Sequence, residues 1–211
     1  VKTLHPAVHG GLLGVRDLDS HVSAMAEHNI LPIDLICIDL YPFEKTIERQ
    51  DVSFAEVIEQ IDIGGPAMIR SAAKNFKFVT VITNPNQYEA VLAEMTTNSG
   101  ATTLSLRQSL SKDAFARTAS YDATIFDWMN SDEETFSNSL RLEHGLSQIL
   151  RYGENPDQPS AVYGDQKHTG PSVVHANVLA GKPLSYNNLM DAAAALELVL
   201  DLHASTSMPS A

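Results

Sequence analysis

Cysteine, long apolar runs and positive charge are all scarce in this chain of 211 residues. Cys37 is its only cysteine, so no intrachain disulfide can form, which is typical of a reducing compartment. No apolar run approaches the roughly 20 residues that a membrane-spanning helix needs. The chain also opens without the basic and apolar regions of a secretory leader. We therefore expect a cytoplasmic protein that does not cross a membrane.

The charge balance excludes some partners and allows others. The chain has 14 Lys and Arg residues against 26 Asp and Glu, a formal net charge of −12. A field of that sign repels nucleic acid and acidic lipid surfaces. A small phosphorylated metabolite can still bind where a few cations and backbone N–H groups converge, so the positions of those cations are informative.

The first part of the chain alternates between short apolar runs and helical patterns. The apolar run 33–40 predicts a buried strand with Cys37 as a small core residue, and the β-branched run 78–83 predicts a second strand. Strands alternating with helices indicate an α/β fold with a parallel sheet. The helical pattern over residues 103–129 suggests an apolar face that includes Leu104, Leu110 and Phe115. The helical patterns cover residues 18–28, 53–61, 66–75, 87–95 and 103–129.

The second part has a different organisation. Residues 130–139 are polar and acidic, as expected of a surface link. Glycine and proline punctuate 151–171, which favours loops and short strands over helix. The Ala- and Leu-rich segment 189–202 predicts a strong helix.

The segment IDIGGPAMIRSAAKN, residues 61–75, predicts an anion or oxyanion site. Gly64 and Gly65 permit a close approach of the backbone to a ligand, and Pro66 is suited to the first helical position. The free N–H groups that follow attract negative charge. An ordinary Gly-Pro turn capping a helix is the alternative interpretation.

Two further clusters carry candidate residues. His5 and His9 stand four residues apart, a spacing that suits a metal on a helix. Pro6 and the following glycines argue against a regular helix there, so structural, hydrogen-bonded histidines are the preferred interpretation. Tyr41 follows the first predicted strand, where ligands of open α/β sheets gather; a hydrophobic plug at the sheet edge is its alternative role.

Five segments in one order resemble a single family: VKTLHPAVHGGLLG, LYPFEKT, IDIGGPAMIRSAAKN, LRYGENPDQ and LSYNNLMDAAAAL. They are similar to the bifunctional purine enzymes that join phosphoribosylaminoimidazolecarboxamide (AICAR) formyltransferase to inosine monophosphate (IMP) cyclohydrolase. The resemblance spans residue 1 to about residue 200.

This resemblance implies two domains. Residues 1–135 would form an IMP cyclohydrolase domain with a methylglyoxal-synthase-like, Rossmann-like parallel sheet. Residues 136–211 would begin an α/β formyltransferase domain of the cytidine-deaminase-like type. The family's phosphate-binding loops are expected before Val1 and its Lys-His formyltransferase motif after Ala211. A homodimer acting on the small ribonucleotides AICAR, its formyl derivative and IMP is also implied, with no nucleic-acid or membrane partner.

The resemblance also implies the site residues. No metal and no cofactor are expected for cyclisation, and 10-formyltetrahydrofolate is the expected co-substrate of formyl transfer. Asp39 and Asp157 stand where the family usually has Asn and His, and an added carboxylate should weaken nucleotide binding. A non-catalytic module that binds phosphorylated metabolites on the same fold is the alternative function. The implied catalytic residues are Lys2, Tyr41, Asp62 and Lys74, and the implied substrate-binding residues are Thr3, Asp39, Gly64, Gly65, Arg70, Arg151, Tyr152, Asn188 and Asp191.

Overall fold

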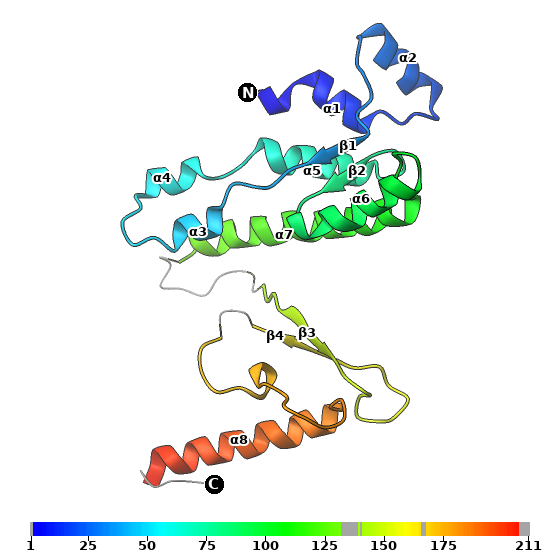
Figure 1. Cartoon of the computed structure of the whole chain (residues 1–211). Helices are drawn as coiled ribbons and strands as arrows, with labels where there is room; N and C mark the ends of the chain where they lie inside the picture. Colours follow the sequence, from blue (N-terminus) through cyan, green and yellow to red (C-terminus); the bar gives the residue numbers. More distant parts are fainter. Residues whose placement is uncertain (1, 132–138, 140, 166–167, 207–211) are drawn as a thin grey trace. The chain divides into compact units, whose positions relative to one another are not determined.

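The computed structural model describes residues 2–131, 139, 141–165 and 168–206 (Figure 1). Internal contacts divide the chain into two units, residues 1–139 and 140–211. Most of the predicted surface link, 130–139, lies outside the described residues.

A small parallel sheet lies in the first unit. β1 (Leu35–Cys37) pairs in parallel with β2 (Thr80–Ile82), in the register Leu35↔Thr80. All of β2 is buried, whereas β1 is mostly exposed. The prediction of an α/β fold with a parallel sheet is confirmed, but the prediction of a buried strand over 33–40 is wrong. β1 is shorter, and its outer edge has no neighbouring strand among the described residues. Cys37 is consequently exposed and does not lie in the core.

The remaining elements of this unit are helical, and five of them lie close to their predicted ranges. We expected Pro6 and the following glycines to prevent a regular helix after His5, and this was wrong. The segment forms a helix that begins at Pro6 and includes both glycines. The elements are η1 (Lys2–Leu4), α1 (Pro6–Leu13), α2 (Asp19–Glu27), α3 (Phe43–Ile47), α4 (Phe54–Glu59), α5 (Gly64–Lys74), η2 (Pro85–Gln87), α6 (Tyr88–Thr97) and α7 (Leu104–Met129).

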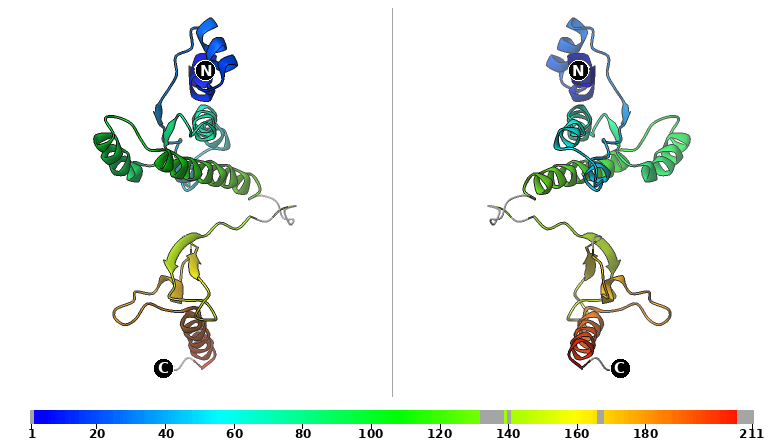
Figure 2. Two further views of the ribbon diagram at one scale, coloured as in Figure 1. Left: turned by 90° about the vertical axis from the view of Figure 1, so that its right-hand side faces the viewer. Right: turned by 90° about the vertical axis from the view of Figure 1, so that its left-hand side faces the viewer.

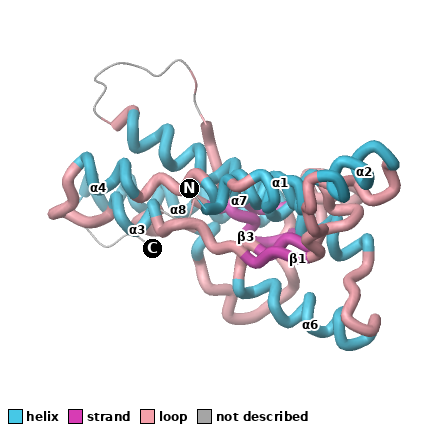
Figure 3. Tube along the Cα trace, turned by 90° about the horizontal axis from the view of Figure 1, so that it is seen from above, coloured by secondary structure: helices cyan, strands magenta, loops and turns pink. Residues whose placement is uncertain are grey.

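Helix α5 is the central helix of the unit. It lies between α1 and α7 and also contacts β2 (Figure 2). Seen from above, α6 lies on the other side of β1 from α1 (Figure 3). Ile69, Ala72 and Ala73 of α5 are fully buried, so the small residues of this helix let α7 pack closely against it.

The predicted apolar face of the long helix α7 is only partly confirmed, because Leu110 is buried but two other members of that face are not. Leu104 and Phe115 are 50% and 39% exposed, so two of the residues assigned to the apolar face lie outside the core. The buried positions repeat every three or four residues, as expected of the helix face that packs against α5. Some of these buried side chains are polar. The buried residues are Leu110, Ser111, Ala114, Thr118 and Tyr121.

The second unit contains an antiparallel pair of strands and one long helix. β3 (Gly145–Ile149) pairs with β4 (Ala161–Gly164), with a register irregularity between Leu146 and Gln148. The 3₁₀ turn η3 (Val173–His175) precedes α8 (Tyr186–Thr206), which begins three residues before the predicted start. In the described part of the chain, no helix is both long and apolar enough to cross a bilayer.

Candidate active site

The amino end of α5 is built around Asp62. Gly64 is the first helical residue and Pro66 the third, so the helix begins two residues before the predicted start at Pro66. The half-buried Asp62 accepts a hydrogen bond at Oδ1 from the backbone N–H of Gly65, over 2.8 Å. One of the N–H groups predicted to face an anionic ligand is thus bonded to the chain's own carboxylate.

Both glycines are required by the side chains beside them. A Cβ atom at Gly65 would lie 2.9 Å from Cγ of Asp62 and closer still to Oδ2, and 2.9 Å from Cδ2 of Leu40. A Cβ atom at Gly64 would lie 2.8 Å from Cβ of Thr3 and closer still to its hydroxyl. Real Cβ contacts essentially never fall below 3.0 Å. The glycines therefore let three separate segments, those of Thr3, Leu40 and Asp62, meet at one helix end.

The segment after β1 reaches the same place. Leu40 is buried against the Gly65 backbone, while the next residue, Tyr41, is 54% exposed. Tyr41 is therefore not a hydrophobic plug, whereas Phe43, two residues later, is fully buried and its ring meets those of Tyr121 and Trp128. Asp39 is exposed just before this turn. Tyr41 and Asp39 are thus open to solvent beyond the carboxyl end of the strand, as a ligand site requires.

Hydrogen bonds of His9 connect the N-terminal segment to α5. His9 of α1 lies 3.0 Å from the hydroxyl of Ser71 through Nδ1 and 3.1 Å from the carbonyl oxygen of Thr3 through Nε2. His5 caps α1, accepting the N–H of Ala7 over 3.1 Å. Both histidines are hydrogen-bonded, as predicted, and the described residues contain no group of three or more His, Cys, Asp or Glu suited to a metal. Lys2 opens η1, but its side chain lies outside the described part.

Two predicted cations lie further along α5. Lys74 is the last helical residue, ten residues after Gly64, which corresponds to about 15 Å along the helix axis. Arg70 is exposed, and its guanidinium lies 5.5 Å from the ring centre of Phe115. The structure therefore brings Thr3, Gly64 and Gly65 together with Asp62, but it does not bring Lys74 or Arg70 to them.

A residue absent from the predicted site, Tyr121, contacts Asp62 directly. Its phenol oxygen accepts the backbone N–H of Asp62 over 2.8 Å and donates to the carbonyl oxygen of Gln60 over 3.2 Å. Burial raises the pKa of the Tyr121 phenol above its ordinary value of 10.0, and the Asp62 and Glu44 charges add to this. The sequence signal that could have found Tyr121 is its position 11 residues, about three helical turns, after Leu110, on the same face of the predicted helix.

The predicted residues of the second unit lie on two segments, one around residue 151 and one at the start of α8. The backbone N–H of Arg151 donates to Leu184, and that of Tyr186 donates to Tyr152, so segments around 151 and 185 run side by side. The Arg151 guanidinium lies 4.8 Å from the Tyr152 ring centre. Ser185 precedes α8 and accepts the N–H of Asn188 over 3.4 Å, while the Asn188 side chain accepts the N–H and the hydroxyl of Ser185 over 3.1 and 3.0 Å, so the two residues cap the helix reciprocally. Asp191 is exposed one turn later.

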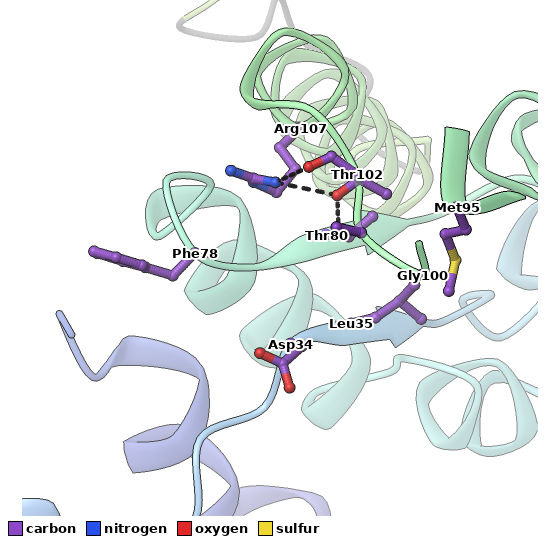
Figure 4. A pocket seen from close by; sticks show the side chains of 9 residues that line it. Asp34, Leu35, Phe78, Thr80, Met95, Gly100, Thr102 and Arg107 are labelled. Carbon is purple, nitrogen blue, oxygen red and sulfur yellow. Dashed lines mark hydrogen bonds between the residues drawn. The ribbon is translucent and has the colours of Figure 1, made fainter. Parts of the chain in front are cut away.

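A cavity of about 260 Å³ lies at the opposite end of the small sheet (Figure 4). Asp34 and Phe78, which precede β1 and β2, line it together with Arg107. The guanidinium of Arg107 donates to the carbonyl oxygens of Phe76, Lys77 and Thr102. These bonds make Arg107 a structural cation that fastens the end of α5 to α7. The cavity is separate from the site at Asp62.

The fold and the site define an α/β chain with a glycine-rich helix terminus beyond the carboxyl ends of a parallel sheet. The family described as AICARFT/IMPCHase bienzyme matches residues 72–210. The chain belongs to this family.

The chain is also similar to curated proteins and to a solved structure. The chain is 52% identical over 202 residues to the bifunctional purine biosynthesis protein PurH of Cereibacter sphaeroides, covering 95% of the chain and 38% of that protein. It is 50% identical over 199 residues to the PurH of Listeria monocytogenes, covering 94% of the chain and 39% of that protein. A structure titled "Crystal structure of ForH" superposes with a TM-score of 0.57 at 33% identity, covering 64% of this chain and 69% of that one. The chain thus spans less than half of the curated relatives it matches.

Proposed function

We propose that this chain contributes the ring-closing site of an IMP cyclohydrolase, within a protein that also has AICAR formyltransferase activity. The observation that carries the proposal is the Asp62 carboxylate held at the Gly64–Gly65 helix terminus, with the Thr3 and Leu40 segments beside it. Membership of the bienzyme family supplies the reaction, and this arrangement supplies an acid–base group in a polar, partly open position.

Ring closure requires the carboxamide nitrogen to attack the formyl carbon. The former formyl oxygen then leaves as water with two protons, one from the carboxamide nitrogen and one from the formamido nitrogen. The amide is a poor nucleophile, so a positioned base contributes about 10²–10⁴-fold. In our proposal Asp62 accepts the carboxamide proton, directly or through Tyr41. The developing oxyanion is stabilised by Lys2 and by the positive end of the α5 dipole. Lys74, about 15 Å away along α5, would attract the anionic substrate together with Arg70 from the exposed helix face.

The finer assignments follow from family membership and are part of the same proposal. Residues 1–135 would form a methylglyoxal-synthase-like cyclohydrolase domain and 136–211 the start of a cytidine-deaminase-like formyltransferase domain; the division of contacts near residue 139 supports this boundary. Arg151, Tyr152, Asn188 and Asp191 would bind the ribonucleotide in the second domain. We further propose 10-formyltetrahydrofolate as formyl donor, no cofactor for cyclisation, a homodimer and a cytoplasmic location.

Ring closure in a hybrid protein tests the proposal. The hybrid replaces the matching segment of the L. monocytogenes relative with this chain, and the appearance of purine absorbance from the formamido ribonucleotide is followed. Asp62→Asn keeps an oxygen for the Gly65 N–H but removes the base, so we expect a rate loss of at least about 100-fold. Asp122→Asn, an exposed carboxylate on α7, is the matched control and should leave the rate unchanged.

Two outcomes would contradict the proposal. A folded hybrid that binds the ribonucleotide but never closes the ring would favour the non-catalytic binding module. Full activity of Asp62→Asn would remove Asp62 from the chemistry.

A further inference from the structure

Tyr121 connects α7 to the segment that carries Asp62, although 59 residues separate them in the sequence. Its side chain is 1% exposed, and its hydroxyl bonds to two backbone groups of that segment, the N–H of Asp62 and the carbonyl of Gln60. The high pKa keeps the phenol protonated, so it can accept the first hydrogen bond and donate the second at once.

The same part of α7 also contacts helix α3, which begins two residues after Tyr41. The ring of Tyr121 meets that of Phe43 edge-on, with centroids 6.1 Å apart. Arg117, one turn earlier, lies 6.0 Å from the Tyr121 ring centre and donates to the Glu44 carboxylate over 2.8 Å. The segment that carries Asp62 and helix α3, which begins two residues after Tyr41, therefore both contact the same part of α7.

We propose that Tyr121 is a positioning residue for ring closure, which holds the Asp62 backbone so that the carboxylate stays on the Gly65 N–H. This inference rests on the proposed function. Tyr121 has no role in the chemistry itself, because its hydroxyl is buried and fully engaged with backbone atoms. Without it, the N–H of Asp62 and the carbonyl of Gln60 lose their common partner, and the Asp62 segment can shift relative to α5.

The test uses Tyr121→Phe, which removes one oxygen atom and keeps the ring that packs on Phe43. In the hybrid protein we expect kcat to fall about tenfold while KM changes less than twofold, because alignment is lost and binding is retained. The effect should vanish in an Asp62→Asn background, since Tyr121 acts through Asp62. Thr118→Val is the matched control: it removes another fully buried hydroxyl of α7, which bonds only within its own helix, to Phe115.

A second readout does not depend on activity. In the chain itself, Tyr121→Phe should accelerate hydrogen exchange at the amides of Asp62 and Gly65 by about tenfold, whereas Thr118→Val should leave them unchanged. Unchanged exchange at both amides, or equal kinetics for Tyr121→Phe and Thr118→Val, would overturn the inference. An Asp62→Asn hybrid with full activity would instead overturn the proposed function, while faster exchange in Tyr121→Phe would still show that Tyr121 positions the segment.

Discussion

Replacing Gly65 with alanine should disrupt the Asp62 arrangement more than its single added carbon suggests. The new Cβ would lie 2.9 Å from Cγ of Asp62, and ordinary contact begins at 3.4 Å, so the carboxyl group must retreat by at least about 0.5 Å. That movement lengthens the 2.8 Å hydrogen bond from the Gly65 N–H beyond the usual range. Gly65 also precedes Pro66, which disfavours helical backbone for any residue with a Cβ.

Two opposing contributions set the expected change in the free energy of unfolding of Gly65→Ala. Losing a hydrogen bond to a charged group costs about 1.5–3 kcal/mol, and alanine returns up to about 1 kcal/mol through its helix propensity. We expect the free energy of unfolding to fall by about 1–2 kcal/mol in urea titrations. The ring-closing rate of the hybrid should fall about tenfold or more, because the carboxylate leaves its position.

Gly10→Ala is the matched control for this substitution. It also adds a Cβ to a helical glycine with a close neighbour, but that neighbour is the terminal methyl of Ile30, which can rotate away. Its stability and rate should stay near those of the unmodified protein. Removing the carboxylate with Asp62→Ala should reduce the stability cost of Gly65→Ala. The reasoning is refuted if both glycine substitutions have equal effects, or if the cost at Gly65 is independent of Asp62.

Three further predictions concern other contacts. Burial acts to raise the pKa of Glu44, but the Arg117 guanidinium and a backbone hydrogen bond together outweigh it and hold the pKa below its ordinary value of 4.5. This pair therefore stabilises the fold fully above about pH 4.5 and progressively less as the pH falls through the lowered pKa. In urea titrations, the free energy of unfolding of Glu44→Gln should depend less on pH in the acid range than that of the unmodified protein. An unchanged pH dependence would contradict this. Ser185→Ala should remove the reciprocal cap with Asn188 and cost α8 about 0.5–2 kcal/mol, measured by circular dichroism during thermal unfolding; no loss of helix stability would contradict it. Arg151→Ala should weaken ribonucleotide binding about tenfold by calorimetry, and unaltered affinity would exclude it from the site.

Local patterns in the sequence were enough to predict the fold class, the positions of most helices and the family. These features depend on local periodicity and on contiguous motifs, which a one-dimensional pattern contains. The Gly64–Gly65 terminus with Asp62 before it was recognisable for the same reason, because the helix signal and the carboxylate are adjacent in the chain.

Which side chains lie beside that terminus depends on tertiary packing and could not be predicted from local patterns. Cys37 was expected in the core because its neighbours are apolar, yet burial depends on what lies across from a strand, and β1 has an open edge in the described part. Lys74 shares a motif with Asp62, but the fixed rise of a helix holds them apart. Tyr121 lies 59 residues from Asp62 and contacts it, because the packing of α7 against α5 brings together positions that no local pattern relates.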